Sequence, residues 1–441
     1  MALETWLIKV KMTISNGLQT IKSYMISKKS NLGVLAFEIA RLMSKLIHLW
    51  QSLSDQNILR LRLQSISLEG VHRIVSDDDA FLLALACAEM VENLRLLAKS
   101  LSRFSKRCDQ NSGLPCFDRL FDEFAETGLD PNGWVLGCKE MESQLKKMDR
   151  FVSLTMTLHK EMNEVSEIEN GLKKLLQSTE HDPLIKEKKI VDLQQKLFWQ
   201  KQQVKYLKES SLWGRSFDKV TPLLARSVFT VLARIKLVFG IRPAIHGPCL
   251  PLSATVHPSE TTTELKNRFL ESNSKILKPP SSTLGAAALA LHCANLIIVL
   301  EKMIRSPQLV GVDARDDLYA MLPTGIRVLL RDRLRGVGFW ASDPVLAAEW
   351  RDALSRIMGW LSPLAHNMIL WQSERSFEQQ NLIPKTNVLL LQTLYFANQA
   401  KTEAAITELL VGLNYIWRFE REMNTRALLE CSNLLKLQSS G

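Results

Sequence analysis

The chain has 441 residues, a hydrophobic content of 46% and a formal net charge of +10. This length predicts two or three domains of about 150 residues, and the hydrophobic content is enough to give each of them a core. The positive charge favours acidic partners, namely nucleic acid, anionic lipid or an acidic protein surface, although no motif gives strong support for nucleic acid. The seven cysteines are scattered without a C-x-x-C pair, which predicts free thiols in a reducing, intracellular compartment.

Residues 1–31 form a basic N-terminal tail that has five lysines and one acidic residue, Glu4. The lysines interrupt the apolar residues too often for the core of a signal peptide, so we expect a protein that is not secreted. The tail is either loosely ordered or a basic amphipathic membrane anchor. Position 2 holds Ala2, whereas N-myristoylation requires a glycine there.

Residues 32–134 are predicted to form an N-terminal helical domain. Apolar residues recur at steps of three and four at Leu35, Ile39, Leu42, Leu46, Trp50 and Leu53. This spacing predicts one amphipathic helix, which Ser54 and Asp55 end. A second helix is expected near residues 57–67, where the alternation in ILRLRLQ would also suit a strand.

Two more helices are expected in this domain. Ser76 is predicted to cap a long helix whose first turn contains the acidic triplet at residues 77–79. That triplet lacks the ligand spacing of a calcium loop. A shorter helix is expected over residues 116–126, ending at Gly128.

Residues 135–240 are predicted to form a long helical hairpin and a following helix that ends at Gly240. On the two sides of a break near Pro183, the apolar residues at helical spacing are Phe151, Leu158, Met162, Val165, Leu172 and Leu176, then Ile190, Leu193, Leu197, Val204 and Leu207. Two antiparallel helices would bury both sets against each other. The many lysines of this segment are expected to be solvated, with partner binding or nuclear import through KEKK as the alternative.

Residues 241–282 change in composition, because prolines there alternate with Ser and Thr. Such a segment cannot be helical throughout, so it is predicted to be a flexible linker. Beyond it we expect a C-terminal helical domain over residues 283–425 and a tail over residues 426–441. No segment is typical of strands, and the predicted fold class is all-α.

The C-terminal domain opens with an apolar run, TLGAAALALHCANLIIVLEKM, that raises the question of a membrane span. Residues 284–300 carry no formal charge and reach the lower limit for crossing a bilayer. His292 and Asn295 lie on one helical face, where each would need a polar partner in lipid. We therefore expect a helix buried in a protein core and no transmembrane segment, with His292 and Asn295 as structural polar residues.

The chain contains none of the standard catalytic or nucleotide-binding motifs, such as G-x-x-x-x-G-K-[ST], G-x-G-x-x-G, H-E-x-x-H or G-x-S-x-G. No metal or cofactor is therefore expected, and no enzyme activity. Two stretches still carry candidate residues for binding.

The first stretch is an arginine stripe on a helix that is predicted to begin at Pro323. Arg327, Arg331 and Arg335 are four residues apart, and their guanidinium groups suit a phosphate or a carboxylate-rich partner. The alternative is pairing within the chain, with Asp316, Asp317 or Asp332 as acceptors. A neighbouring arginine, Arg333, is expected to pair with a buried carboxylate.

The second stretch is WLSPLAHNMILWQSERSFEQQN, residues 360–381. His366 and Glu374 lie on the same side of a helix, but the helical rise separates them by about 12 Å, which is too far for a base and its orienting acid. We expect both to be structural polar residues. Trp371 and Arg375 are spaced for a cation–π contact or a docking surface.

Several long motifs in order resemble one plant family. LGVLAFEIARLMSKLIHLWQSLSD resembles the N-terminal domain of the PSK SIMULATOR family, which is named for phytosulfokine peptide-hormone signalling. TLGAAALALHCANLIIVLEKMI, DDLYAMLPTGIRVLLRDRLR and PLAHNMILWQSERSFEQQN are similar to its C-terminal domain of unknown function. The resemblance covers residues 32–134 and 283–422. It implies a growth-promoting intracellular regulator that resides in the nucleus and has no assigned catalytic residue, although Ala2 departs from the myristoylated glycine of the family.

These observations lead to two function hypotheses. The first is a non-enzymatic regulator or scaffold that promotes growth through protein–protein interactions. The alternative is a peripheral membrane protein, or a binder of phospholipid or phosphate, at the plasma membrane or in the cytoplasm. The identity of the partner proteins and the oligomeric state are left open.

Overall fold

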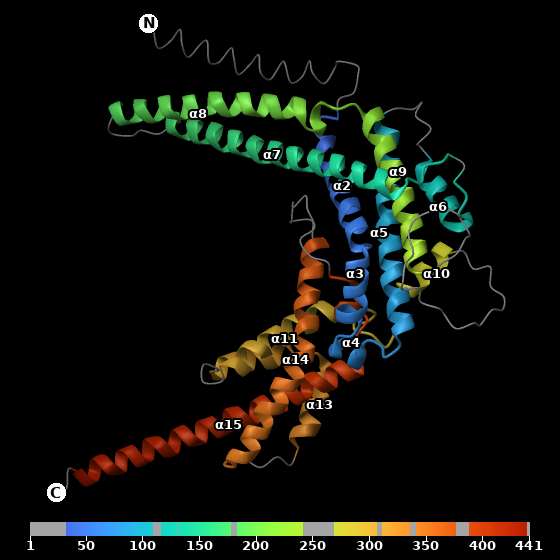
Figure 1. The fold of residues 1–441 in the computed structure, drawn as a ribbon. Helices are drawn as coiled ribbons and strands as arrows, with labels where there is room; N and C mark the ends of the chain where they lie inside the picture. The colour runs from blue at the N-terminus through green and yellow to red at the C-terminus, as the bar shows by residue number, and fades with distance from the viewer. Residues whose placement is uncertain are drawn as a thin grey trace. The chain divides into compact units, whose positions relative to one another are not determined.

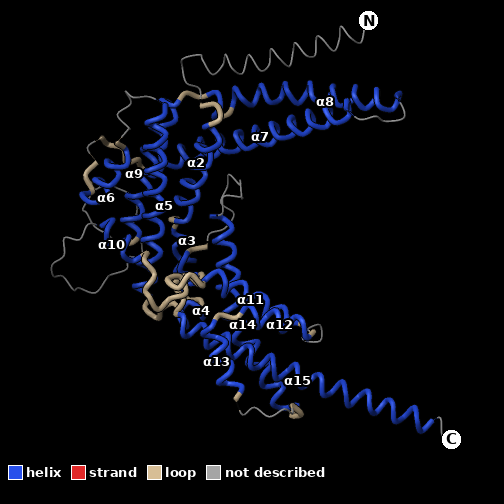
Figure 2. The backbone as a smooth tube through the Cα atoms, turned by 180° about the vertical axis from the view of Figure 1, so that it is seen from behind, coloured by secondary structure: helices blue, strands red, loops and turns tan. Residues whose placement is uncertain are grey.

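The computed structural model describes residues 32–108, 116–130, 132–177, 183–240, 269–306, 311–335, 341–375 and 388–438. Over these ranges the chain folds into fourteen α-helices, α2 to α15, with one short π-helix and two 3-10 turns. Figure 2 shows helices joined by loops and no strand in the described chain. The all-α fold class predicted from the sequence is confirmed. The basic tail over residues 1–31 lies outside the described residues.

The chain divides into two compact units that interleave in sequence. Unit 1 contains the described residues of 32–48 and 94–233, and unit 2 contains those of 49–93, 234–240 and 269–438. Three helices, α2 (Leu35–Ser52), α5 (Asp79–Cys108) and α9 (Phe217–Val238), contribute residues to both units. The units therefore do not correspond one to one with the domains predicted from the sequence.

Unit 1 has an aromatic core formed by α6 (Phe117–Thr127), α9 and the loop that follows α6. The ring of Phe229 stacks on Phe124 with a centroid distance of 4.6 Å and meets the ring of Trp134 edge-on at 5.0 Å. Phe117 lies against Phe229 as well. Helix α6 ends where Gly128 takes a positive φ of 70°, which is the helix end that the sequence predicts.

The predicted helical hairpin is present in unit 1. Helix α7 (Cys138–Gln177) and helix α8 (Pro183–Ser210) lie side by side along their length, as Figures 1 and 2 both show. Lys201 of α8 pairs with Glu169 of α7 at 2.8 Å, and Gln200 donates to Glu164 at 3.1 Å. Exposed residues recur along both helices, so part of the surface of each is in contact with solvent.

Unit 2 is built around α11 (Ala290–Arg305), α14 (Pro344–Arg375) and α15 (Gln399–Gln438). Buried apolar residues of these helices, together with Ile74 of α4 (Glu69–Ile74), form one continuous core. Helix α15 approaches α14 closely at Gly412, where a Cβ atom would lie 2.6 Å from the ring of Trp350. Helices α12 (Val312–Met321) and α13 (Thr324–Leu334) complete the unit, and α13 packs on α15.

The first helix of the C-terminal region begins later than the sequence predicts. Residues 281–289 form turns, and α11 starts at Ala290. The turns pair with the segment before α15: Leu284 N donates to Ala397 O, and Gly285 N donates to Tyr395 O, both at 2.9 Å. A Cβ atom on Gly285 would lie 2.4 Å from that same Tyr395 oxygen. The small residues thus admit a neighbouring backbone, but as a turn rather than as a helix.

Three other sequence-based boundaries are corrected. The predicted linker ends earlier, because residues 269–276 form helix α10 (Phe269–Ile276) with Leu270 buried; residues 241–268 lie outside the described chain. Within the predicted C-terminal helical domain, the described segment just before α15 is not a full helix and contains only the 3-10 turn Leu390–Gln392. Helix α5 is preceded by Asp78, whose side chain accepts from Ala80 N at 2.9 Å, so the capping residue is Asp78 and not Ser76.

The remaining short elements agree with the helical interpretation of the sequence. Helix α3 (Asp55–Arg60) has Ser54 as its N-cap and runs directly into the π-helix Leu61–Ile66, so ILRLRLQ is helical and not a strand. In the described part of the chain, no helix combines the length and the apolar character needed to cross a bilayer.

Candidate functional site

The arginine stripe of α13 lies beside α12, where one tyrosine organises it. Arg331 donates from Nε and Nη2 to the hydroxyl of Tyr319 at 3.2 and 3.0 Å. The guanidinium of Arg327 lies 5.5 Å from the centre of the Tyr319 ring and donates to Ala320 O at 2.6 Å. The predicted acceptors Asp316 and Asp317 do not take these roles. The two arginines are thus held in place without losing their charge to a carboxylate.

A second stack continues this surface. The guanidinium of Arg315 lies 3.6 Å from the centre of the Trp417 ring of α15, and Arg421 approaches the same ring at 5.4 Å. Arg315 and Tyr319 are four residues apart on α12 and therefore share one face of that helix. Sequence reasoning missed Arg315 and Arg421, because the stack joins two helices that lie about a hundred residues apart in the chain.

We call Arg315, Arg327, Arg331 and Arg421, with Tyr319 and Trp417, the arginine–aromatic surface. None of its four arginines has an ion-pair partner within 4.0 Å in the described part of the chain. Cation–π stacking holds a guanidinium flat on a ring and leaves its edge available for an oxyanion.

The other two arginines of α13 are paired within the chain. Arg335 follows the last residue of the helix and lies 3.4 Å from Asp332, as the alternative interpretation of the sequence expected. Arg333 pairs with Glu408 of α15, so the expectation of a carboxylate partner is confirmed. That carboxylate is only half-buried, so the expectation of burial is wrong. Among the described residues, Arg335 is therefore the one member of the stripe that has a carboxylate partner.

Trp371 and Arg375 of α14 both bind the buried carboxylate of Glu89, which the sequence analysis did not predict. Their predicted cation–π contact is present, with the guanidinium 3.7 Å from the ring centre. Both side chains also donate to Glu89 Oε1 at 3.3 Å, while the backbone N–H of Leu390 donates to Glu89 Oε2 at 2.6 Å. The side chain of Glu89 is only 7% exposed. We call these four residues the Glu89 cluster.

The electrostatics of the Glu89 cluster are those of a desolvated ion pair. Burial raises the pKa of the Glu89 carboxyl, and the Leu390 N–H and the charge of Arg375 offset only part of that rise. Burial likewise lowers the pKa of Arg375, against the opposing effect of Glu89. Three donors on one carboxylate leave no oxygen for a substrate, so this cluster ties α5 to α14 and the segment before α15. Docking of an external partner on Trp371 and Arg375 stays a prediction.

The polar residues of the apolar run and of residues 360–381 lie at the surface. His292 is half-buried and its Nε2 lies 2.7 Å from Met321 O, so it is hydrogen-bonded but is not a core residue. Asn295 is exposed. His366 Nε2 lies 2.7 Å from Glu301 of α11, not near Glu374, which is half-buried. None of these contacts assembles an acid and a base around a shared cavity.

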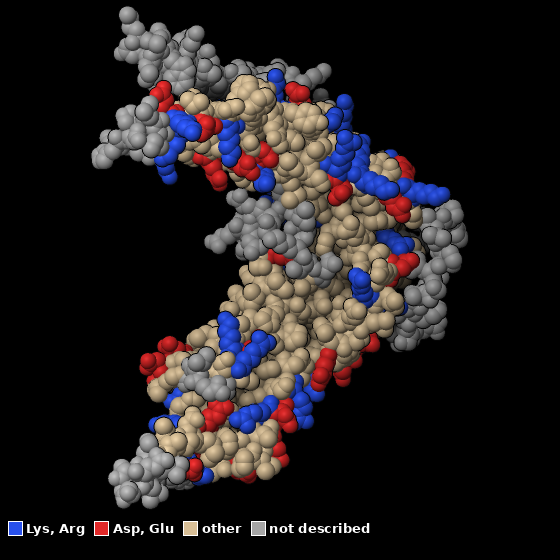
Figure 3. All heavy atoms as spheres, turned by 60° about the vertical axis from the view of Figure 1, so that its left-hand side comes forward, with Lys and Arg blue, Asp and Glu red and all other residues tan. Residues whose placement is uncertain are grey.

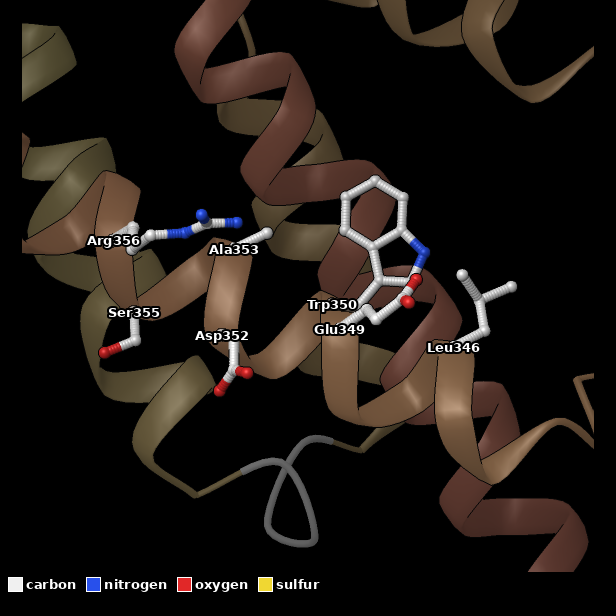
Figure 4. A pocket seen from close by; sticks show the side chains of 7 residues that line it. All are labelled: Leu346, Glu349, Trp350, Asp352, Ala353, Ser355 and Arg356. Carbon is white, nitrogen blue, oxygen red and sulfur yellow. The ribbon is translucent and has the colours of Figure 1, made fainter.

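A shallow, open groove runs along α14. It is lined by Leu346, Glu349, Trp350, Asp352, Ala353, Ser355 and Arg356. In Figure 4 these side chains fan out from a single helix, and the carboxylates and the guanidinium do not point toward a common centre. No group of three or more His, Cys, Asp or Glu side chains suited to a metal ion occurs in the described chain.

The thiols of the buried cysteines have low reactivity. Burial raises the pKa of Cys87 to about 12, and burial together with the charge of Glu403 does the same for Cys293. A thiol with such a pKa is protonated at neutral pH and is a poor nucleophile. Within the described residues Cys116, Cys138 and Cys431 are not in disulfide bonds either, as the sequence predicts.

Two family models of unknown function match the chain. The protein of unknown function DUF668 covers residues 283–370, and the domain of unknown function DUF3475 covers residues 34–90. Protein PSK SIMULATOR 1 of Arabidopsis thaliana is 28% identical over 88% of this chain, and PSK SIMULATOR 3 and 2 are 27% and 24% identical over 88% and 90% of it. The chain is a distant homologue of the PSK SIMULATOR proteins. It spans 56–61% of the length of these relatives, and no solved structure matches it.

Residues of the arginine–aromatic surface and of the Glu89 cluster lie in the two segments that the family models match. Arg327 and Arg331 lie in the DUF668 segment, and Glu89 lies in the DUF3475 segment. Residues 49–93 and 283–370 fall in the same compact unit, where Gly70 of α4 packs directly on Trp360 O of α14. The larger part of the DUF3475 segment, residues 49–90, is therefore packed with the DUF668 segment in unit 2.

Proposed function

We propose that this chain is a non-enzymatic intracellular regulator that promotes growth by binding other proteins, as its homology to the PSK SIMULATOR proteins suggests. The observation that carries the proposal is the outer side of α8. Phe198, Trp199 and Tyr206 are 57%, 64% and 68% exposed there, on the side of the hairpin that faces away from α7. Aromatic side chains are enriched in the cores of protein interfaces, whereas soluble surfaces rarely collect them.

Charge supports a docking role over a purely electrostatic one. On the face that Figure 3 shows, Lys and Arg side chains are interspersed with Asp and Glu side chains, so the net charge of +10 does not gather into one field there. The proposal includes a location in the nucleus or cytoplasm and a role in a plant growth pathway.

The test is genetic rescue in a plant that lacks this protein. The wild-type chain is expected to restore growth, and a chain with Phe198→Ser and Trp199→Ser is expected not to restore it at equal abundance. Leu428→Ser with Leu429→Ser removes two apolar residues of similar exposure on α15 and serves as the matched control. Full rescue by the α8 variant would refute a role for this surface, and a fluorescent fusion of each chain reports its location.

The arginine–aromatic surface supports a second candidate function, binding of a phosphate-bearing ligand at a membrane. Three guanidinium groups lie over two rings and a fourth, that of Arg331, is hydrogen-bonded to the Tyr319 hydroxyl, all without a carboxylate partner among the described residues. Such an arrangement suits oxyanions better than a stripe of mobile lysines does. Under this second candidate function, the protein would be located at the periphery of the membrane.

Flotation with vesicles that contain a phosphoinositide tests this candidate. Arg327→Glu with Arg331→Glu is expected to lower the floated fraction several-fold, whereas Arg60→Glu with Arg103→Glu makes the same change in net charge elsewhere and is expected to have a small effect. Equal loss in both variants would show non-specific attraction, and free inositol phosphate as competitor separates the headgroup from the bilayer. Absence of flotation for the wild type would end this candidate.

A further inference from the structure

Helix α8 has two apolar sides, and within the described part of the chain only one of them packs on another helix. The side that packs on α7 carries Leu193, Leu197, Val204 and the buried Leu207. At about 100° per residue, the opposite side carries Val191, Phe198, Trp199 and Tyr206, which are between 53% and 68% exposed. We call this opposite side the outer face of α8. A helix that is apolar on two sides is usually covered on both.

The polar residues of the outer face form a row with a distinctive order. Lys188, Gln195, Gln202 and Glu209 are spaced by seven residues and run down the middle of the face, from a positive end to a negative end. Phe198 and Trp199 lie at the centre of this row, with Gln195 and Gln202 equally far from them on either side. The row is therefore self-complementary when it is read in the opposite direction.

We propose that the chain forms an antiparallel homodimer in which the outer faces of two α8 helices pack together. With the twofold axis between residues 198 and 199, Lys188 of one copy faces Glu209 of the other, and Gln195 faces Gln202. The ring of Phe198 in each copy then faces the ring of Trp199 in the other copy at the axis. A parallel pair would instead place Lys188 against Lys188 and Glu209 against Glu209, which repel.

The size of the face fits a dimer of moderate strength. The row from Lys188 to Glu209 spans about 31 Å of helix, which is the length of a short coiled coil. The exposed aromatic residues of each copy would bury roughly 100 Å² apiece, and the flanking side chains bring the contact toward the lower range of specific interfaces. The proposal rests on the proposed docking role of this face and names a second copy of the chain as its occupant.

The first experiment measures mass in solution. Sedimentation velocity of the full chain at increasing concentration is expected to show a rise from one copy, 50.1 kDa, toward two. Phe198→Ser with Trp199→Ser is expected to weaken the dimer at least tenfold, and the control Leu428→Ser with Leu429→Ser is expected to leave it unchanged. Circular dichroism of each variant establishes that α8 is still folded.

The second experiment tests the direction of the pair. In chains with Cys116→Ser and Cys431→Ser, a mixture of Gln195→Cys and Gln202→Cys chains is expected to crosslink with a short bismaleimide. Either variant alone is expected to crosslink little, because identical positions lie about 10 Å apart along the axis. Lys188→Glu is expected to weaken the dimer, and adding Glu209→Lys to the same chain is expected to restore it.

Three results would overturn the proposal. One is a one-copy mass at every concentration, which is also what coverage of the outer face by another segment of the same chain would give. The others are a dimer that survives the Phe198 and Trp199 substitutions, and self-crosslinking of Gln195→Cys, which would indicate a parallel pair. A monomer whose α8 variant still fails to restore growth would leave the proposed function standing with a different partner.

Discussion

At the scale of single residues, the Glu89 cluster shows what a sequence can and cannot reveal. The contact between Trp371 and Arg375 is local, and the spacing of four residues was enough to predict it. The carboxylate that both of them bind lies 282 and 286 residues away. In the sequence Glu89 is an unremarkable acidic residue in a helix, because only the tertiary fold buries it against three donors.

We expect Glu89→Ala to be among the most destabilising substitutions in the chain. It would leave the Arg375 charge and the Leu390 N–H without their acceptor in a buried place, at a cost of about 3–5 kcal/mol. Glu89→Ala combined with Arg375→Met is expected to cost clearly less, since no unpaired charge remains. Urea unfolding of the two variants measures both values, and equal destabilisation would contradict the buried ion pair.

The contact between His366 and Glu301 predicts a dependence on pH. Burial by itself would raise the pKa of Glu301, but hydrogen bonds from His366 and Ser362 and the charges of His366 and Arg305 outweigh it, so the pKa is lowered. A carboxyl with a lowered pKa stabilises the fold above its unfolded pKa and loses that contribution as the pH falls through the folded value.

Glu301→Gln is accordingly expected to cost about 1–2 kcal/mol at pH 6, and the difference from the wild type should shrink as the pH falls below about 4. Urea unfolding at a series of pH values measures the gap. Glu430→Gln on the exposed part of α15 is the control and should show no such trend. A constant gap across the series would show that Glu301 acts through packing rather than through its charge.

At the scale of helices and loops, the periodicity of apolar residues was a reliable guide to helices and a poor one to their ends. The stripe from Leu35 to Leu53 and the hairpin of α7 and α8 were predictable, because amphipathic spacing that continues over many turns is typical of helices. The start of α11 was not. Its apolar, alanine-rich sequence suits a helix, but the chain turns there instead: Gly285 N donates to Tyr395 O before α15, and Ala288 takes a positive φ of 57°.

Close approaches at glycine give a prediction about the packing of α4 on α14. A Cβ atom on Gly70 would lie 2.3 Å from the backbone oxygen of Trp360, which cannot rotate away. Gly70→Ala should therefore lower the free energy of unfolding by about 1–3 kcal/mol. Gly359→Ala, one position before Trp360 and with open space around it, should raise it by about 0.5–1 kcal/mol through helix propensity. Thermal unfolding of both variants decides, and a stabilising Gly70→Ala would be evidence against this packing.

At the scale of the whole molecule, the composition predicted more than one compact body, but not how the chain is shared between them. Contiguous domains are the natural expectation from a proline-rich linker. The fold instead assigns residues 49–93 to the same unit as the C-terminal helices. Backbone hydrogen bonds hold the two segments together, for example from Asn398 N to Ile74 O at 2.6 Å. Bonds between residues so far apart in the chain cannot be predicted from local sequence patterns.

The far part of the hairpin should be separable from the rest of the molecule. Among the described residues of 166–195 only Ile168 is buried, so this part makes few contacts beyond its own two helices. Replacing residues 166–195 with a short glycine-containing turn is expected to leave the unfolding free energy of the remainder within about 1 kcal/mol. Hydrogen exchange of the backbone amides in α5 and α11 measures the unfolding free energy of the remainder. A loss of protection throughout both helices would mean that the hairpin is needed for folding.

The packing of Gly70 on Trp360 has a practical side for anyone who dissects this protein. A fragment cut at the borders of either domain of unknown function would lose the surface that its other half covers, and would expose the apolar side of α4 or of α14. Such a fragment would bind other proteins non-specifically through this apolar surface, so the proteins that it captures would not identify the partners of the intact chain. Binding regions are better located by point substitutions in the intact chain.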